Sequence, residues 1–202
     1  MATTIVYLGC MFSGKTKRIL ADMEKALFAE KDALLLKSAK DTRSHMVASH
    51  DGDTMMGEHV TTLEHDPPGL HDGIKLIAID EAQFIPGVAD FCKRQNALGR
   101  DVRVAGLNSY ANKDRTTWPE MRPFLGFARI VSLEATCTLC KAPAYCSRKL
   151  EQTVQEEGTM DVGADEKYIA TCETCYTLPV SKERLQHRRD VISKLRRLKN
   201  SI

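Results

Sequence analysis

The chain has 202 residues, a net charge of +2 and a composition that is 43% hydrophobic and 28% charged. These values are ordinary for a soluble globular protein, and so small a net charge predicts neither a nucleic-acid nor a membrane partner. No apolar run is long enough to span a membrane, and the N-terminus lacks the basic segment of a secretory signal, so we expect a cytoplasmic protein.

Short apolar runs alternate with helical or polar segments along the first part of the chain. The run at 4–8 ends at a glycine and precedes a helical pattern at 17–29, whereas 38–73 is polar and predicts loops around one short helix. Because strands that alternate with helices form parallel sheets, we expect an α/β fold with a parallel sheet and helices on both faces. The predicted strands cover residues 4–8, 33–36, 76–79, 102–107 and 130–133.

The character of the chain changes near residue 135, where paired cysteines and an acidic stretch begin. The segment 181–199 has apolar residues at helical spacing, and residues 181–202 contain eight Lys or Arg against two acidic residues. We therefore predict a nucleotide-binding domain at 1–134, a small metal-binding domain at 135–180, and a basic C-terminal tail or helix at 181–202.

Residues 9–16 match the phosphate-loop pattern G-x-x-x-x-G-K-[ST] in full. Glycines let backbone N–H groups turn toward phosphate oxygens, and the helix that follows presents the positive end of its dipole to the anion. Lys15 is placed to reach the β- and γ-phosphates of ATP, and the Thr16 hydroxyl to ligate Mg²⁺. A chance glycine-rich turn is the alternative, but the preceding strand and the following helix are the context that the motif requires. The predicted loop consists of Gly9, Cys10, Met11, Phe12, Ser13, Gly14, Lys15 and Thr16.

Asp80 and Glu81 follow directly on the apolar run at 76–79. An acid at the end of a buried strand supplies a carboxylate to the Mg²⁺ of a nucleotide site. Neighbouring side chains on a strand point in opposite directions, so one carboxylate can serve the metal and the other an incoming hydroxyl. By itself such a pair is often a strand that meets solvent; together with the phosphate loop it predicts a P-loop nucleotide enzyme.

Two C-x-x-C pairs lie in the second half of the chain. In a reducing compartment, paired cysteines are better explained by metal binding than by disulfides. Four thiolates make a closed tetrahedral site, which favours structural over catalytic zinc. The 31 residues between the pairs would then form a long loop clamped at its base, whereas two redox pairs are the competing interpretation. The predicted zinc ligands are Cys137, Cys140, Cys172 and Cys175.

Six short motifs, in this order, resemble the thymidine kinase family of the cellular and poxvirus type. Any one of these motifs alone is weak evidence for the family, but their order and spacing from about residue 4 to residue 176 are highly specific for it. They are MFSGKT at 11–16, KDTR at 40–43, HD at 50–51, IDEAQF at 79–84, and the segments 133–140 and 163–168.

The resemblance implies an enzyme that transfers the γ-phosphate of ATP to the 5′-hydroxyl of thymidine, and of deoxyuridine as well, to form dTMP. It implies that Glu81 is the general base, that Asp80 and Thr16 hold Mg²⁺, and that zinc is structural. It also implies a homotetramer and dTTP as a feedback inhibitor. Other residues expected on the phosphate side are Asp41, Thr42, Arg43, Gln83 and Arg148.

The resemblance further implies that the zinc anchors a lasso loop over the nucleoside, and that backbone groups of this loop grip thymine. Side chains would wall the base, although an ordinary core role is the alternative, above all for Leu107. The expected lasso residues are Thr159, Met160, Asp161, Val162 and Gly163, and the expected wall is Met11, Phe84, Leu107, Tyr110, Trp118, Cys146 and Tyr168.

The chain departs from the family pattern mainly around the expected substrate pocket. Cys10 stands where proline is usual, Asn108 replaces an aspartate, and Tyr110 comes one residue earlier than the family's aromatic. Cys146 stands where a threonine is common, and Trp118 occupies an aromatic position in a rewritten segment.

Two other functions remain open from the sequence. A nucleic-acid-dependent P-loop ATPase would use a zinc ribbon and the basic tail to hold the strand, and its ATP hydrolysis would depend strongly on salt. A non-catalytic nucleotide-binding regulator would not need Lys15, Thr16, Asp80 and Glu81 together.

Overall fold

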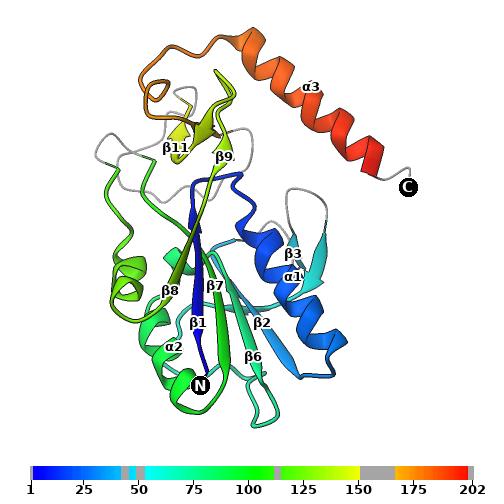
Figure 1. Cartoon of the computed structure of the whole chain (residues 1–202), viewed down its shortest axis with the longest axis vertical. Helices are drawn as coiled ribbons and strands as arrows, with labels where there is room; N and C mark the ends of the chain where they lie inside the picture. Colours follow the sequence, from blue (N-terminus) through cyan, green and yellow to red (C-terminus); the bar gives the residue numbers. More distant parts are fainter. Residues whose placement is uncertain (1, 42–45, 49–52, 112–114, 151–166, 200–202) are drawn as a thin grey trace.

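A six-stranded sheet forms the centre of the protein (Figure 1). The computed structural model describes residues 2–41, 46–48, 53–111, 115–150 and 167–199. Every neighbouring pair of strands in the sheet is parallel, in the order β5-β2-β6-β7-β1-β8. The strands are β1 (Thr4–Gly9), β2 (Ala33–Ser38), β5 (Glu58–Val60), β6 (Leu76–Asp80), β7 (Asp101–Leu107) and β8 (Arg129–Leu133).

Helices cover both faces of this sheet, as the sequence predicted. The helix α1 (Lys15–Phe28) buries Ile19, Leu20 and Met23 against one face, because residues at this spacing share one side of a helix. The opposite face packs against α2 (Val88–Ala97) and two 3₁₀ segments, η1 (Ala82–Phe84) and η2 (Pro119–Gly126). The prediction of a parallel α/β sheet is therefore confirmed.

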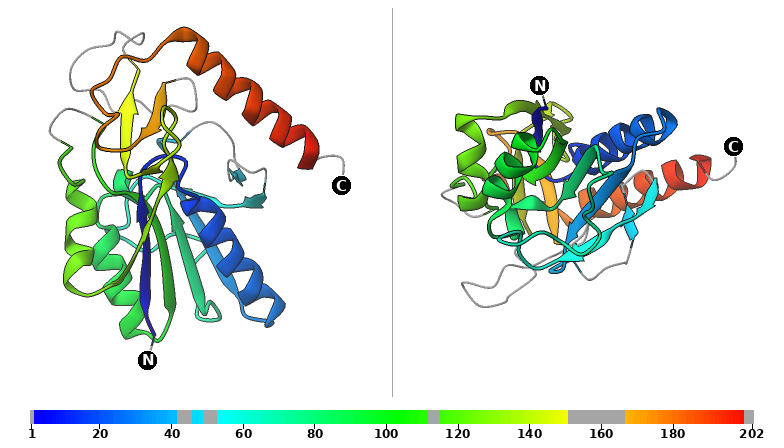
Figure 2. Two further views of the ribbon diagram at one scale, coloured as in Figure 1. Left: turned by 45° about the horizontal axis from the view of Figure 1, so that its top comes forward. Right: turned by 90° about the horizontal axis from the view of Figure 1, so that it is seen from below.

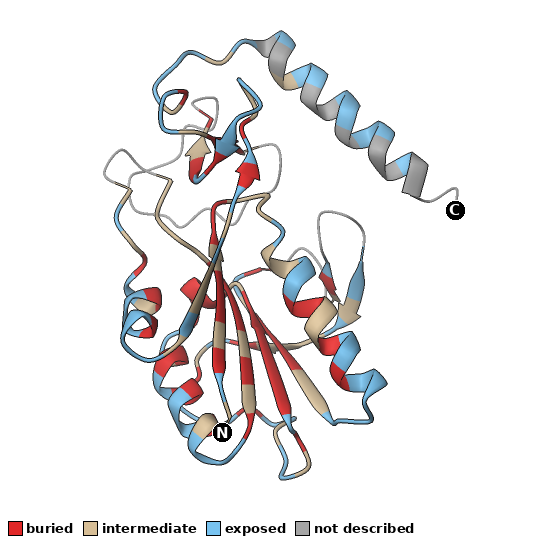
Figure 3. Ribbon diagram, viewed as in Figure 1, coloured by how far each residue is buried: buried red, intermediate tan, exposed pale blue. Residues whose placement is uncertain are grey.

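Strand β6 is buried along its whole length, from Leu76 to Asp80 (Figure 3). A strand covered on both faces reads as a continuous apolar run without alternation, which explains why its sequence is so hydrophobic before the acid. Since parallel strands end at one edge of the sheet, β1, β6 and β7 bring Gly9, Asp80 and Leu107 to the same edge.

The polar segment 38–73 differs from the prediction of loops around one short helix. Its described residues form three short strands: β5, and a hairpin of β3 (Met46–Ala48) with β4 (Thr54–Met56). Strands of three residues carry too few side chains to show a two-residue period, so the pattern could not reveal them.

Two small antiparallel sheets of two strands each form a separate layer beyond the carboxyl ends of the sheet, which we call the small region (Figure 2). Its apolar core includes Cys137, Ala170 and Cys175 and also takes in Cys10 of the phosphate loop. The small region therefore packs directly on the predicted nucleotide site, and the division at residue 134 stays a prediction. Its strands are β9 (Ala135–Thr136), β10 (Pro143–Ala144), β11 (Cys146–Lys149) and β12 (Tyr168–Thr171).

The C-terminal helix α3 (Lys182–Lys199) projects away from the small region (Figures 1 and 2). Among the described helices, this one included, none combines the length and the apolar character needed to cross a membrane.

Candidate active site

The turn between β1 and α1 has the backbone shape of a phosphate loop. Gly14 has a φ of 80°, a left-handed conformation that glycine adopts without strain, and α1 begins at the next residue. A Cβ atom on Gly9 would lie 2.5 Å from both the Leu133 carbonyl oxygen and the Ser13 Oγ, so only glycine fits there. These two positions are the fixed glycines of the motif, and the helix N-terminus that follows is a ready anion site.

Side chains of the loop hold its own backbone in place. The Lys15 Nζ donates to the Cys10 carbonyl at 2.7 Å, and the Ser13 Oγ donates to the same oxygen at 2.8 Å. From β11, the Ser147 Oγ accepts from the Met11 N–H at 2.9 Å. Burial lowers the pKa of Lys15, and the charges of Glu81, Cys10 and Asp80 oppose that shift. A bound phosphate would add negative charge and so favour the protonated lysine further.

Thr16 and Asp80 meet at the carboxyl edge of the sheet. The Thr16 Oγ1 lies 3.1 Å and 3.3 Å from the two carboxylate oxygens of Asp80. Burial raises the pKa of Asp80 to about 7, and the nearby Glu81 charge acts in the same direction. A hydroxyl and a buried carboxylate at this distance fit the oxygen donors that Mg²⁺ prefers, and a cation here would stabilise the charged carboxylate.

Glu81 lies beside this pair in a left-handed conformation, with a φ of 53°. Its N–H donates to the Asp80 Oδ1 at 3.0 Å, and its carboxylate accepts from the Gln83 Nε2 at 2.5 Å. The Gln83 Oε1 in turn accepts from the Leu107 N–H at 3.0 Å. Gln83 therefore ties the Glu81 carboxylate to the end of β7. A positive φ in a non-glycine residue is uncommon, and strained residues of this kind cluster at functional sites.

Three aromatic residues of the predicted wall lie together, and the N–H of one of them, Phe84, donates to the Glu81 carbonyl at 3.0 Å. Tyr110 and Trp118 stack with ring centroids 3.8 Å apart, and Trp118 meets Phe84 edge-on at 5.2 Å. The Tyr110 N–H donates to the Thr116 carbonyl at 2.9 Å, which closes the loop between β7 and η2 that carries both rings. We call the described residues 108–111 and 115–118 the aromatic loop. Leu107 packs against the same cluster, and Trp118 is buried with 6% exposure.

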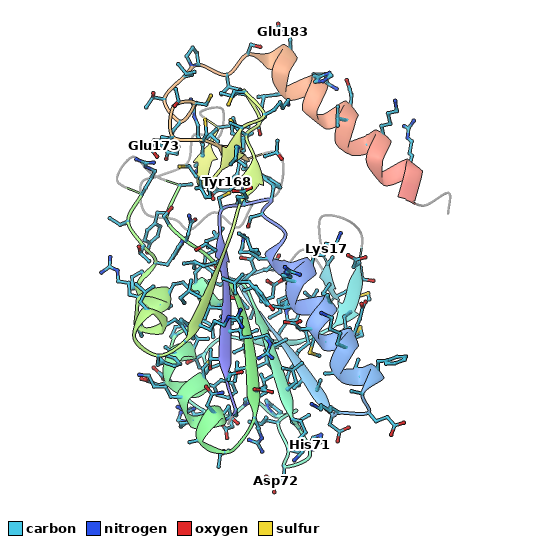
Figure 4. All side chains as sticks on the ribbon, viewed as in Figure 1. Lys17, His71, Asp72, Tyr168, Glu173 and Glu183 are labelled. Carbon is cyan, nitrogen blue, oxygen red and sulfur yellow. The ribbon has the colours of Figure 1, made fainter. Side chains whose placement is uncertain are left out.

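The structure places the other predicted wall residues in or next to the small region. Cys146 is buried on β11, Tyr168 is half-buried at the start of β12, and Met11 is half-buried in the phosphate loop (Figure 4). The expected lasso residues 159–163, together with Thr42 and Arg43, lie outside the described residues.

Two residues expected on the phosphate side have protein partners. Asp41 is buried and pairs with Lys37, whose Nζ lies 3.1 Å from its Oδ2. Arg148 donates from Nη1 to the carbonyl oxygens of Cys175 and Leu178. The phosphate roles of Asp41 and Arg148 therefore stay predictions.

The sequence reasoning missed some residues at the site, among them Asn108 and Ser147. Asn108 follows the strand predicted at 102–107, so its place at a strand end could have identified it. Its Nδ2 donates to the Tyr145 carbonyl at 2.8 Å. The Asn108 Oδ1 and the Trp118 Nε1 are buried and have no hydrogen-bond partner in the part of the chain that the structure describes. Buried polar atoms of this kind are candidates to bind a ligand.

The four predicted zinc ligands come together in the small region and are called the cysteine cluster. Their Sγ atoms all lie within 4.8 Å of one another, and those of Cys140 and Cys172 are 3.6 Å apart. A tetrahedral zinc with bonds of about 2.3 Å places its sulfurs about 3.8 Å apart, so these residues fit that metal. The two pairs meet because Cys137 follows β9 and Cys172 follows β12, which lie side by side.

Comparison with known proteins identifies the family. Residues 2–176 match the sequence profile of a family described as thymidine kinase. A thymidine kinase of fowlpox virus (strain NVSL) is 32% identical over 179 residues, covering 85% of this chain and 94% of its own length. A cytosolic thymidine kinase of Bos taurus is 33% identical over 173 residues, covering 85% of this chain and 70% of its own length. A thymidine kinase of Rhodothermus sp. (strain ITI 518) is 32% identical over 179 residues, covering 86% of this chain and 81% of its own length.

The matched region includes the phosphate loop, the Asp80–Glu81 pair and all four residues of the cysteine cluster. It ends before α3 begins. The resemblance noted in the sequence is thus confirmed, and the chain belongs to the thymidine kinase family.

Proposed function

We propose that this protein transfers the γ-phosphate of ATP to the 5′-hydroxyl of thymidine, with Glu81 as the general base. The single observation that carries the proposal is the position of the Glu81 carboxylate. Gln83 and the Asp80 side chain hold Glu81 beside Thr16, at the sheet edge where the phosphate loop begins α1. A kinase needs a base next to the phosphate site, and this arrangement supplies one.

In the proposed reaction the nucleoside 5′-oxygen attacks the γ-phosphorus. The new oxygen–phosphorus bond forms as the bond to the bridging oxygen of ADP breaks, and the hydroxyl proton passes to the Glu81 carboxylate. The backbone N–H groups of the phosphate loop, the Lys15 ammonium and the N-terminus of α1 would hold the phosphates. Mg²⁺, held by Thr16 and Asp80, would neutralise developing charge on the phosphates when bound.

The nucleoside would lie against the aromatic loop. Tyr110 and Trp118 form a stacked pair next to Phe84, and flat rings favour stacking with a flat base. Lasso backbone groups at 159–163 would read the O2, N3–H and O4 of the pyrimidine, because backbone donors and acceptors pair independently of side-chain identity. A purine would need a wider slot, so thymidine and then deoxyuridine are the expected substrates.

Zinc bound by the cysteine cluster would be structural and would close the base of the segment 135–180. The four thiolates leave no open position for a substrate, which is the arrangement of a structural site. A homotetramer, feedback inhibition by dTTP and a cytoplasmic location belong to the same proposal, and the resemblance to the family supports them. The basic tail is proposed to be peripheral to catalysis.

A nucleic-acid-dependent ATPase is the rival function, and two assays of the same protein distinguish it from the proposed kinase. The purified protein is incubated with Mg·ATP and one radiolabelled nucleoside at a time, and formation of the nucleoside monophosphate is measured. The nucleosides are thymidine, deoxyuridine, deoxycytidine, deoxyadenosine and deoxyguanosine. We expect thymidine first, deoxyuridine second by a modest factor, since one methyl group in an apolar pocket is worth about 1–3 kcal/mol at most. Purine deoxynucleosides should give negligible product.

The same protein is assayed for ATP hydrolysis with and without single-stranded DNA over a range of salt concentrations. Efficient phosphorylation of a purine, or ATP hydrolysis that appears only with DNA and falls steeply with salt, would contradict the proposal.

A further inference from the structure

An ion pair joins the aromatic loop to the cysteine cluster. Arg115 lies in the aromatic loop, and Glu173 lies between Cys172 and Cys175, 58 residues further along the chain. Two nitrogens of the guanidinium donate to the two carboxylate oxygens, with the Nη2–Oε1 distance at 2.6 Å. Figure 4 shows Glu173 in the small region, above the sheet. Segments that are distant in sequence are thus held together at this point.

The contact is more elaborate than most exposed ion pairs. Single-bonded pairs on the surface contribute little, whereas a bidentate arginine–carboxylate pair also fixes the orientation of both groups. The Arg115 guanidinium lies 5.0 Å from the centroid of the Tyr176 ring, and its Nη1 is 3.3 Å from the Sγ of buried Cys146. The Cys146 Sγ is in turn 3.7 Å from the Glu173 Oε2. Arg115 therefore has partners on three sides.

Arg115 is placed to influence the nucleoside side of the proposed site. The next residue, Thr116, accepts a hydrogen bond from the Tyr110 N–H, and Trp118 follows Arg115 by three residues. Cys146, which Arg115 contacts, belongs to the predicted wall as well. An ion pair that holds Arg115 therefore restrains the aromatic loop, which carries the wall residues Tyr110 and Trp118. Arg115 also contacts a third wall residue, Cys146. The phosphate loop and Glu81 also have hydrogen bonds that involve neither Arg115 nor Glu173.

We propose that the Arg115–Glu173 pair is a clasp that positions the aromatic loop for the nucleoside by tying it to the cysteine cluster. This inference rests on the proposed function, because it concerns the nucleoside wall of that site. Arg115 and Glu173 are positioning residues: they fix Tyr110 and Trp118 and act on no reacting atom. Loss of the clasp raises the KM for thymidine, and leaves kcat and the KM for ATP close to their wild-type values.

Four variants test the clasp. Glu173→Gln keeps the shape and removes the charge, Arg115→Gln removes the guanidinium, and the double variant combines them. Arg115→Lys keeps the charge but loses the planar fork, so it should give an intermediate effect. Each variant is assayed for kcat, both KM values and zinc content. Trp118 is the only tryptophan in the chain, so acrylamide quenching of its fluorescence reports loop opening without any reference to activity.

Lys93→Gln is the matched control. Lys93 also forms an exposed ion pair, with Asp90 at 3.0 Å, and its Nζ lies 5.2 Å from the centroid of the Phe127 ring. It belongs to α2 and lies in neither the aromatic loop nor the small region. This variant should match the wild-type protein in every readout.

The clasp predicts that either single variant raises the thymidine KM by about two- to five-fold and increases quenching of Trp118. The double variant should be no worse than either single one, because each removes the same interaction. Additive effects of the two changes, or wild-type KM and quenching in both, would overturn the clasp. Zinc loss in Glu173→Gln would also overturn it, since the effect would then arise at the metal.

Failure of the proposed function and failure of the clasp would give different experimental results. If the wild-type protein does not phosphorylate thymidine, that function is wrong, while the quenching of Trp118 across the four variants still decides whether the clasp holds the loop.

Discussion

The Gln83 side chain donates to the carboxylate of Glu81 at 2.5 Å while it is itself fixed to the backbone at the end of β7. Glu81 has a left-handed backbone conformation, which is strained for a non-glycine residue. The hydrogen bond from Gln83 gives the carboxylate of Glu81, the proposed base, its direction. This carboxylate is therefore held from two strands of the sheet, β6 through the chain and β7 through the hydrogen bond between Gln83 and Leu107.

Gln83→Met should preserve the fold and reduce turnover. The methionine has a similar length but makes neither hydrogen bond, so the Glu81 carboxylate loses its orientation. We expect kcat to fall by about 10- to 100-fold, as for small misplacements of a reacting group. The free energy of unfolding should fall by about 1–3 kcal/mol, because the partly buried N–H of Leu107 loses its acceptor.

Gln95→Met is the control for this change. Gln95 is also buried and hydrogen-bonded, to Asp66 and Arg100, but it lies in α2 away from the site. It should lose stability and keep kcat. Urea unfolding measures the stability of both variants, and steady-state kinetics measure their kcat. Equal kcat values for Gln83→Met and the wild-type protein would show that Gln83 does not orient the Glu81 carboxylate for the reaction.

Removal of one cysteine of the cluster should release the metal. Cys172→Ser replaces a thiolate by a poor zinc ligand, and the segment 135–180 then loses its anchor, so the thymidine KM should rise. Elemental analysis should find one zinc per chain in the purified wild-type protein and almost no zinc in the Cys172→Ser variant. Cys92→Ala, which removes a buried thiol from α2, should retain the zinc. Active wild-type enzyme without stoichiometric zinc would rule this site out.

The C-terminal helix should be dispensable for phosphoryl transfer. The family match ends at residue 176, before α3, and most basic charge runs are simply solvated. A chain truncated after Val180 should keep the kcat and both KM values of the full chain. Circular dichroism and thermal unfolding provide the check on folding, and an inactive but folded truncation would assign α3 a role in the reaction.

The sequence predicted the centre of the fold closely because its strands are buried on both faces. The apolar runs at 76–79 and 102–107 correspond to β6 and β7 within one residue at either end. The helical periodicity covers 17–29, while the phosphate loop predicts a helix start near Lys15, and α1 begins at Lys15 because the loop leads directly into it. Strand β5 was not predicted, since three residues carry no clear period.

Only part of the candidate site could be predicted, because a sequence shows local patterns and not contacts between distant segments. Motifs of consecutive residues, such as 9–16 and 80–81, are visible in a sequence, and the four cysteines were found from their spacing. The Arg115–Glu173 pair joins two irregular segments far apart in the chain, and no periodicity connects them. The stacking of Tyr110 on Trp118 was equally invisible, because it depends on how the aromatic loop closes.

The most direct test of the account is the turnover of Glu81→Gln. This change keeps the shape of the side chain and removes the proton acceptor, so kcat for thymidine should fall by about 10²- to 10⁴-fold while ATP binding persists. Glu64→Gln, an exposed change elsewhere in the chain, should leave kcat unaltered. Both proteins are measured by thymidine phosphorylation at saturating Mg·ATP, with ATP binding by calorimetry. A large loss of kcat with ATP affinity retained is the predicted result, and near-wild-type turnover in a folded Glu81→Gln protein would contradict the role of Glu81 as the base.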